Sequence, residues 1–116
     1  MTSESMRDAQ QTMEAYVRDL LNHGDYARHF SDDVGVEVQG TPQRYEGREA
    51  VRQWIDSAHA FGEAKVRDLF TSERHAAAEA EFIRRDGVSI PYSVIYDLAD
   101  GKITALRLYF TGPLQS

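Results

Sequence analysis

The second half of the chain contains two Asp-Gly dipeptides, at positions 86–87 and 100–101, between segments rich in apolar residues. Asp-Gly is typical of tight β-hairpin turns, because such turns require positive φ angles that glycine adopts without strain. Each dipeptide therefore predicts that the strands on its two sides pair with one another. The strands expected in this half are Lys65–Ser72, Ala76–Arg85, Val88–Leu98 and Lys102–Thr111.

The first segment of the chain predicts an amphipathic helix. Its apolar residues recur every three or four positions, and they are Met6, Ala9, Met13, Tyr16, Val17, Leu20 and Leu21. Ser3 or Ser5 could cap this helix, and Gly24 is expected to end it. Asp25 is expected to cap a short second helix that carries Tyr26 and Phe30.

A strand and a third helix follow. Val34, Val36 and Val38 alternate with other residues, which is typical of a half-buried strand. Gly47 precedes a helix whose apolar stripe is Ala50, Val51, Trp54, Ile55 and Ala58. Helices followed by strands indicate an α+β fold in which a curved antiparallel sheet wraps around the helices. A length of 116 residues fits one domain over residues 1–116.

Composition excludes several classes of function. A net charge of −6 disfavours nucleic acid as a partner, because the phosphate backbone would be repelled. With no cysteine there is no disulfide, thiolate metal site or cysteine nucleophile. No segment has the features of a signal peptide or a membrane span, so we expect a soluble cytoplasmic protein without a membrane partner.

A two-residue turn at Asp86-Gly87 fixes the register of the hairpin around it. It pairs Ile83 with Ile90, Glu81 with Tyr92 and Glu79 with Val94, so that these six side chains share one face of the sheet. The other face carries Ala78, Ala80, Phe82, Ser93 and Ile95. The pairing leaves open which face is buried, and composition alone favours Phe82 and Ile95 inside with both glutamates in water.

The order of these motifs resembles that of a known family. Its parts are Asn22-His23-Gly24-Asp25, the segment from Tyr45 to Arg52, Asp100-Gly101-Lys102-Ile103 and Leu106 to Phe110. Together they resemble the SnoaL-like polyketide cyclases and ketosteroid isomerases of the nuclear transport factor 2-like superfamily. The resemblance implies a cone-shaped α+β barrel, built on a long N-terminal helix and two shorter helices, with an apolar pocket. It also implies a homodimer formed through the outer sheet face, where Ile95, Arg107 and Tyr109 could make contacts.

The resemblance further implies a set of site residues. It assigns Glu81 as a general acid or base, Glu79 as a neighbour that raises its pKa, and Tyr92 or Tyr16 as the donor to a substrate oxygen. The implied pocket lining is Val36, Val38, Trp54, Ile90, Val94, Leu106, Leu108 and Phe110. Such a lining suits a small hydrophobic ligand, for example a carbonyl or polyketide-like compound, and no cofactor is expected.

The chain departs from the known relatives at positions that matter for chemistry. Ketosteroid isomerases carry their acidic residues where this chain has Val38 and, approximately, Val94. Three functions therefore stay open: acid–base isomerisation, cyclisation or a related addition; a non-catalytic ligand-binding or dimerisation domain; and an epoxide hydrolase with a rearranged site that depends on Glu81.

Four histidines are further acid–base candidates, although none has a metal-ligand spacing. His23 and His59 lie near predicted helix ends, where capping of the helix is the simpler interpretation. His59 could also reach the mouth of the pocket.

Overall fold

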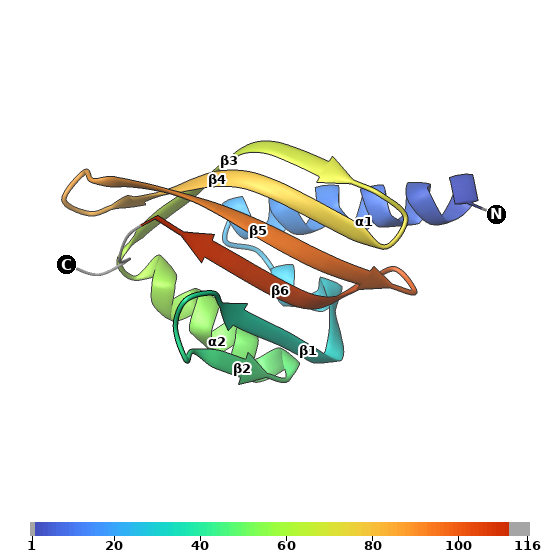
Figure 1. The fold of residues 1–116 in the computed structure, drawn as a ribbon, viewed down its shortest axis with the longest axis horizontal. Helices are drawn as coiled ribbons and strands as arrows, with labels where there is room; N and C mark the ends of the chain where they lie inside the picture. Colours follow the sequence, from blue (N-terminus) through green and yellow to red (C-terminus); the bar gives the residue numbers. More distant parts are fainter. Residues whose placement is uncertain (1, 112–116) are drawn as a thin grey trace.

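The computed structural model describes residues 2–111, with side chains from Met6 onward (Figure 1). Its helices are α1 (Thr2–Leu21), the short 3-10 helix η1 (Tyr26–His29) and α2 (Arg48–His59). Its strands are β1 (Phe30–Val38), β2 (Arg44–Glu46), β3 (Gly62–Thr71), β4 (His75–Arg84), β5 (Ser89–Ala99) and β6 (Lys102–Phe110). None of the helices in residues 2–111 is long and apolar enough to cross a membrane. The predicted α+β class is confirmed.

The six strands form one curved, open sheet in the order β2-β1-β6-β5-β4-β3. Four neighbouring pairs are antiparallel, as expected, but β1 and β6 are parallel, so the prediction of a purely antiparallel sheet is wrong in this detail. A parallel pair requires a long connection, and here everything between β1 and β6 supplies it. The short edge strand β2 was not predicted, because three residues give too little alternation to detect.

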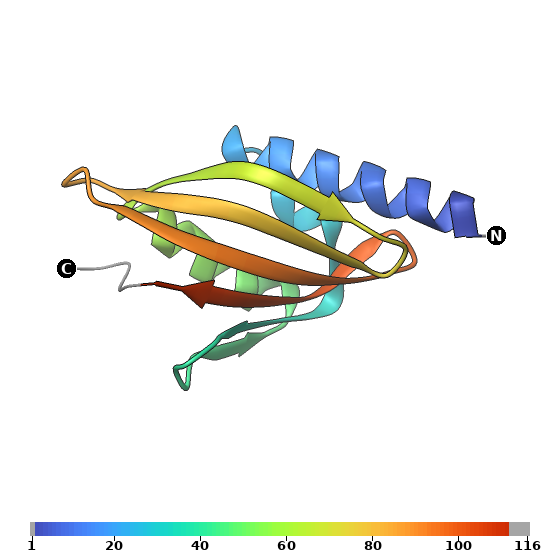
Figure 2. The same ribbon diagram turned by 45° about the horizontal axis from the view of Figure 1, so that its top comes forward.

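The helices α1 and α2 lie on the same side of the sheet (Figures 1 and 2). The core between helices and sheet includes side chains that are fully buried, with no exposed fraction: Met13, Phe30, Val34, Val36, Val51 and Ile103. Aromatic rings cluster in this core, and the ring of Tyr16 on α1 packs 5.6 Å from that of Phe30 and 5.8 Å from that of Tyr96. The long first helix is thus held by its apolar stripe, as the sequence pattern predicted.

The first helix ends differently from the expectation. Gly24 does not take the left-handed conformation; His23 does, with a φ of 57°. The His23 N–H donates to the Leu20 carbonyl at 3.3 Å and the Gly24 N–H to the Asp19 carbonyl at 2.7 Å, which is the Schellman pattern. The prediction that the Asp25 side chain caps the next helix is also wrong, because this side chain makes no capping hydrogen bond to η1.

The two Asp-Gly turns have different geometries. Asp100 and Gly101 both have positive φ angles, 52° and 73°, and form the predicted two-residue turn between Ala99 and Lys102. At the other turn only Gly87 has a positive φ, of 89°. The Asp86 side chain accepts a hydrogen bond from the Val88 N–H at 3.1 Å, and Arg84 pairs with Val88 across a three-residue loop.

The longer loop shifts the predicted register by one residue. Ile90 pairs with Phe82, Tyr92 with Ala80 and Val94 with Ala78, while Glu79 lies opposite Ser93 and Glu81 opposite Pro91. Because side chains alternate between faces, a shift of one residue moves both glutamates away from Tyr92 and Val94. The predicted grouping of these residues on one face is therefore wrong.

Among the glycines of the described residues, Gly62 is the one where an added side chain would have the least room. A Cβ atom added there would collide with the carbonyl oxygen of Ile83 and lie 2.9 Å from the Phe82 ring. We expect Gly62→Ala to lower the free energy of unfolding by about 1–3 kcal/mol, because β3 must move away from β4. Urea denaturation followed by circular dichroism measures this change. Gly35→Ala is the matched control: the nearest atom to its added Cβ is the Tyr45 carbonyl oxygen at 3.8 Å. Equal stability of the two variants would contradict the predicted collision.

Candidate functional site

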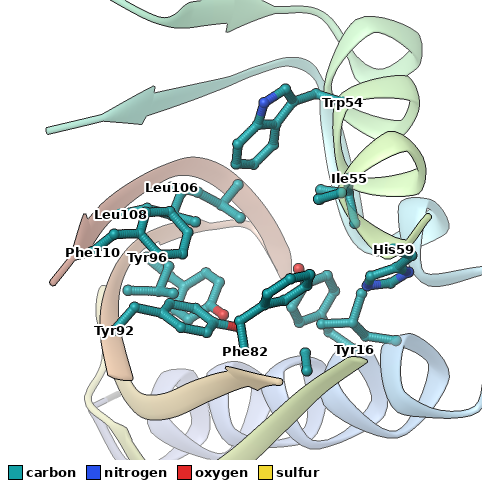
Figure 3. Close-up of a pocket in the computed structure, with 14 residues that line it drawn as sticks. Tyr16, Trp54, Ile55, His59, Phe82, Tyr92, Tyr96, Leu106, Leu108 and Phe110 are labelled. Carbon is teal, nitrogen blue, oxygen red and sulfur yellow. The ribbon is translucent and has the colours of Figure 1, made fainter. Parts of the chain in front are cut away.

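An apolar pocket lies between the helices and the concave face of the sheet (Figure 3). Its lining comes from α1, α2, β3, β4, β5 and β6, and consists of Tyr16, Leu20, Trp54, Ile55, Ala58, His59, Ala64, Phe82, Tyr92, Val94, Tyr96, Leu106, Leu108 and Phe110. The cavity volume is about 60 Å³, which is room for about two water molecules. No carboxylate is among these lining residues, so the polar groups of the pocket are tyrosine hydroxyls, the Trp54 indole N–H and one imidazole.

Three tyrosines contribute hydroxyls to this pocket. The oxygens of Tyr92 and Tyr96 point toward its middle, and the Tyr16 oxygen also faces into it (Figure 3). Burial raises the pKa of Tyr92 to about 12. Burial also raises the pKa of Tyr16 and that of Tyr96, and charge repulsion from neighbouring tyrosines raises both further. The hydrogen bond between the two side chains raises the pKa of Tyr96 and lowers that of Tyr16, for which the net shift is still upward. All three therefore stay protonated near neutral pH and can donate a hydrogen bond to an oxygen in the pocket.

His59 is the titratable group of the pocket whose ordinary pKa lies near neutrality. It is the last residue of α2 and is half-buried at the pocket edge (Figure 3). Burial lowers its pKa, and the nearby His23 lowers it further. His59 is thus a neutral imidazole near neutral pH, and a neutral imidazole can accept a proton from a bound compound.

A polar cleft of about 280 Å³ lies next to the apolar pocket and shares His59 with it. Its lining is His23, Gly24, Asp25, Tyr26, Ala27, Arg52, Asp56 and His59. The Tyr26 hydroxyl donates to the Asp56 carboxylate at 2.5 Å, and Arg52 pairs with the same carboxylate at 2.9 Å. His59 therefore separates an apolar pocket from a polar cleft.

The two glutamates expected in the pocket lie on the outer face of the sheet. Glu79 is exposed, and Glu81 is held by Arg67 at 2.6 Å and by the Ser89 hydroxyl at 2.8 Å. The hydrogen bond from Ser89 and the pairing with Arg67 lower the pKa of Glu81. The expected rise in pKa is therefore wrong, since Glu81 is paired with a cation instead of being repelled by Glu79. The geometric basis for an acid–base role of either glutamate, and for the epoxide hydrolase alternative that depended on Glu81, is absent.

The other predicted site residues divide into two groups. The pocket brings together Tyr16, Tyr92, Trp54, Val94, Leu106, Leu108 and Phe110. Val36, Val38 and Ile90 are buried, with 0%, 7% and 5% exposed, but do not line the cavity.

Sequence reasoning gave no pocket role to Phe82 and favoured a capping role for His59. Alternation along one strand indicated that Tyr96 could join Tyr16 and Tyr92 as a hydrogen-bond donor, and Tyr96 does line the pocket. Phe82 was missed as a pocket residue because the predicted pairing of β4 with β5 was wrong by one residue, which placed Glu81 instead of Phe82 on the same face as Tyr92. His59 was recognisable only as a histidine near a helix end, since its neighbours come from distant parts of the chain.

Residues 10–106 match the family model of the SnoaL-like domain. This match spans most of the chain, and the fold agrees with it. The protein belongs to the SnoaL-like domain family.

Solved structures with the same fold include a nuclear transport factor 2-like protein of unknown function from Mesorhizobium loti. It is 18% identical with a TM-score of 0.81, over 92% of this chain and 93% of that one. A protein from Xanthomonas campestris pv. campestris, provisionally assigned as a polyketide cyclase, is 18% identical with a TM-score of 0.77, over 90% of this chain and 91% of that one. A protein from Kribbella flavida, provisionally assigned as a ketosteroid isomerase, is 18% identical with a TM-score of 0.78, over 97% of this chain and 81% of that one. No curated protein matches the chain. At these identities the likeness establishes the fold, and function must be argued from the site.

Proposed function

We propose that the protein binds a small, mostly apolar carbonyl compound in the pocket and transfers a proton on it, as a cofactor-independent isomerase or cyclase. One observation carries this proposal: protonated tyrosines and a neutral histidine line the same otherwise apolar pocket. In a site of low polarity, hydrogen bonds to a developing negative charge are stronger than in water.

Each group has a role in the proposed reaction. His59 takes a proton from the carbon next to the carbonyl. The electron pair of the broken C–H bond forms a carbon–carbon double bond, and the π electron pair of the carbonyl moves onto its oxygen. Tyr92, Tyr16 or Tyr96 donates a hydrogen bond to that oxygen and stabilises the enolate. An enolate conjugated with a further double bond then accepts a proton from His59 at a more distant carbon, which is isomerisation. Alternatively, the enolate carbon attacks a second carbonyl of the same molecule, and the alkoxide that forms accepts the proton from His59, which is cyclisation. None of these steps requires a metal ion or an organic cofactor.

The pocket must widen to accept a ring compound. Its volume of about 60 Å³ is below the roughly 300–1,000 Å³ of typical ligand sites. The residues that can rotate are aromatic: Trp54 stacks on Tyr45 with ring centroids 6.0 Å apart, and Phe110 packs 4.8 Å from Tyr92. We infer that the substrate is compact and largely flat, since a narrow space between aromatic rings favours such a shape.

The experiment uses 1-indanone, a bicyclic ketone with one enolisable position, as the probe. Incubation in D₂O with the protein, followed by proton NMR, measures exchange of the hydrogens next to the carbonyl. Faster exchange than in buffer, together with shifts in the amide NMR signals of pocket residues, supports the proposal. Binding without any acceleration of exchange contradicts the proposed catalysis.

The second candidate is a non-catalytic binding domain, and one observation favours it: no carboxylate lines the pocket. Carboxylates are common general bases, so a pocket without one is compatible with binding alone. The same NMR experiment separates the two candidates, because a binding domain shifts the amide signals and leaves the exchange rate at its buffer value.

We also propose that the outer face of the sheet pairs with a second copy of the chain. Tyr109, which is 47% exposed, and the half-buried Ile95 lie on this face beside Arg107, which forms a two-point ion pair with Asp97. Analytical ultracentrifugation tests this proposal, and a monomer at all working concentrations would refute it.

A further inference from the structure

His23 occupies a position where glycine is usual. It is the left-handed residue that follows α1, with a φ of 57°, and the next residue along the chain is a glycine. A left-handed conformation is unfavourable for a residue with a Cβ atom. Backbone strain of this kind is frequently associated with functional sites. The question is therefore what the histidine side chain does there.

The side chain connects the pocket residue His59 to solvent. The rings of His23 and His59 are 5.5 Å apart and nearly perpendicular. On its other side, the His23 Nε2 atom lies 3.4 Å from a carboxylate oxygen of Glu63 at the start of β3. The His23 and Glu63 side chains are 55% and 67% exposed. A half-buried imidazole at the pocket is thus followed by an exposed imidazole and an exposed carboxylate.

We propose that His23, oriented by Glu63, relays protons between His59 and solvent. This inference rests on the proposed function, in which His59 removes a proton from the substrate. His59 gains that proton on the ring nitrogen that faces the pocket and becomes a cation. It then releases the proton of its other ring nitrogen to His23, directly or through one water molecule. His23 passes that proton to bulk water. The reverse transfer, from water through His23, returns a proton to the outer ring nitrogen of His59, and His59 gives the proton on its pocket-facing nitrogen to the product, which restores the first tautomer.

The charges around His59 suit such a relay. Asp56 and Glu63 favour its cationic form, whereas burial and His23 disfavour it, with a net lowering of the pKa of His59. The polar cleft also contains Asp25, Tyr26 and Arg52, and Arg52 pairs with both Glu49 and Asp56. A proton on His59 is therefore released readily, and the exposed His23 ring that would receive it lies 3.4 Å from the Glu63 carboxylate.

The first test needs no substrate. In protein labelled with ¹⁵N-histidine, NMR measures how fast the ring N–H of His59 exchanges with water. We expect His23→Asn, which keeps a side chain tolerant of left-handed φ but removes the titratable ring, to slow this exchange at least about fivefold. His75→Asn is the matched control, since His75 is an exposed histidine that pairs with Asp97. Unchanged His59 exchange in His23→Asn would overturn the relay.

A second variant separates the relay from an effect on folding. His23→Gly removes the strained Cβ atom and should raise stability, while it slows His59 exchange as much as His23→Asn does. If His23→Gly leaves the exchange rate unchanged, the relay is wrong.

The indanone assay then distinguishes the two proposals. If the wild-type protein does not accelerate indanone exchange but His23→Asn slows His59 exchange, the proposed function fails and the relay stands. If the wild-type protein accelerates indanone exchange and His23→Asn changes neither rate, the proposed function stands and the relay fails. If both hold, added imidazole buffer should restore the indanone exchange rate of His23→Asn, since a small base can replace the missing ring.

Discussion

His59→Gln should lower the rate of indanone hydrogen exchange by about 10²-fold or more, which is the usual contribution of a general base. Glutamine retains a polar side chain of similar length but does not accept a proton near neutral pH. The tyrosine hydroxyls and the apolar lining are unchanged, so the affinity for indanone should stay close to that of the wild type. Proton NMR gives the exchange rate, and titration of the amide signals gives the affinity.

The pH dependence of the wild-type rate provides a second check on His59. Burial and the neighbouring His23 lower the pKa of His59 below its ordinary value near 6.5. Because the neutral imidazole is the base, the rate should rise with pH, with the midpoint of the rise below about 6.5. The His59→Gln variant should show no such rise. A wild-type profile with its midpoint above 6.5 would assign the base to another group.

Glu81→Gln is the informative counterpart of His59→Gln. Since Glu81 lies on the outer face and is paired with Arg67, its replacement should leave the exchange rate unchanged. A large loss of activity in Glu81→Gln, with normal activity in His59→Gln, would reverse the assignment made from the pocket.

The largest loss of stability is expected for Phe30→Ala. The Phe30 side chain has no exposed fraction, and its ring packs against those of Tyr16 and Tyr26, with ring centroids 5.6 and 6.1 Å away. Truncation of a buried phenylalanine leaves a cavity and costs about 3–5 kcal/mol. A domain of this size is stable by only about 5–15 kcal/mol, so the variant should unfold at a much lower urea concentration.

Phe70→Ala is the control for this truncation. The Phe70 side chain lies on β3 and is 56% exposed, so the same change should cost no more than about 1 kcal/mol. Similar losses in the two variants would show that the ring cluster around Phe30 does not stabilise the core as its burial indicates.

The agreement between sequence and structure is best where local pattern is sufficient. The stripe along α1, the alternation of Val34, Val36 and Val38, and the turn at Asp100-Gly101 were all predicted from neighbouring residues. Their periods of 3.6 and 2 residues are properties of the helix and the strand themselves. The family resemblance also rested on the order of such local motifs, and the SnoaL-like match confirms it.

The two Asp-Gly turns mark the limit of this reasoning. The dipeptide is the same, yet one turn has two residues and the other has three. Both loops are compatible with the local sequence, and they differ by one residue in register. In the three-residue form Phe82 shares the buried face with Tyr92 and Val94, and both glutamates lie on the outer face. Burial of the apolar face thus favours one register over the other, and that balance involves the helices as well as the hairpin.

The sequence by itself therefore determined the class of fold, the positions of most elements and the apolar character of the pocket. Tertiary structure decided which polar groups reach that pocket. It placed Glu81 beside Arg67 on the outer face, and it brought His59 from the end of α2 to the tyrosines of α1 and β5. The physical reason is that periodicity fixes which side chains share a face, whereas only packing between distant elements fixes which face is buried and what lies across from it.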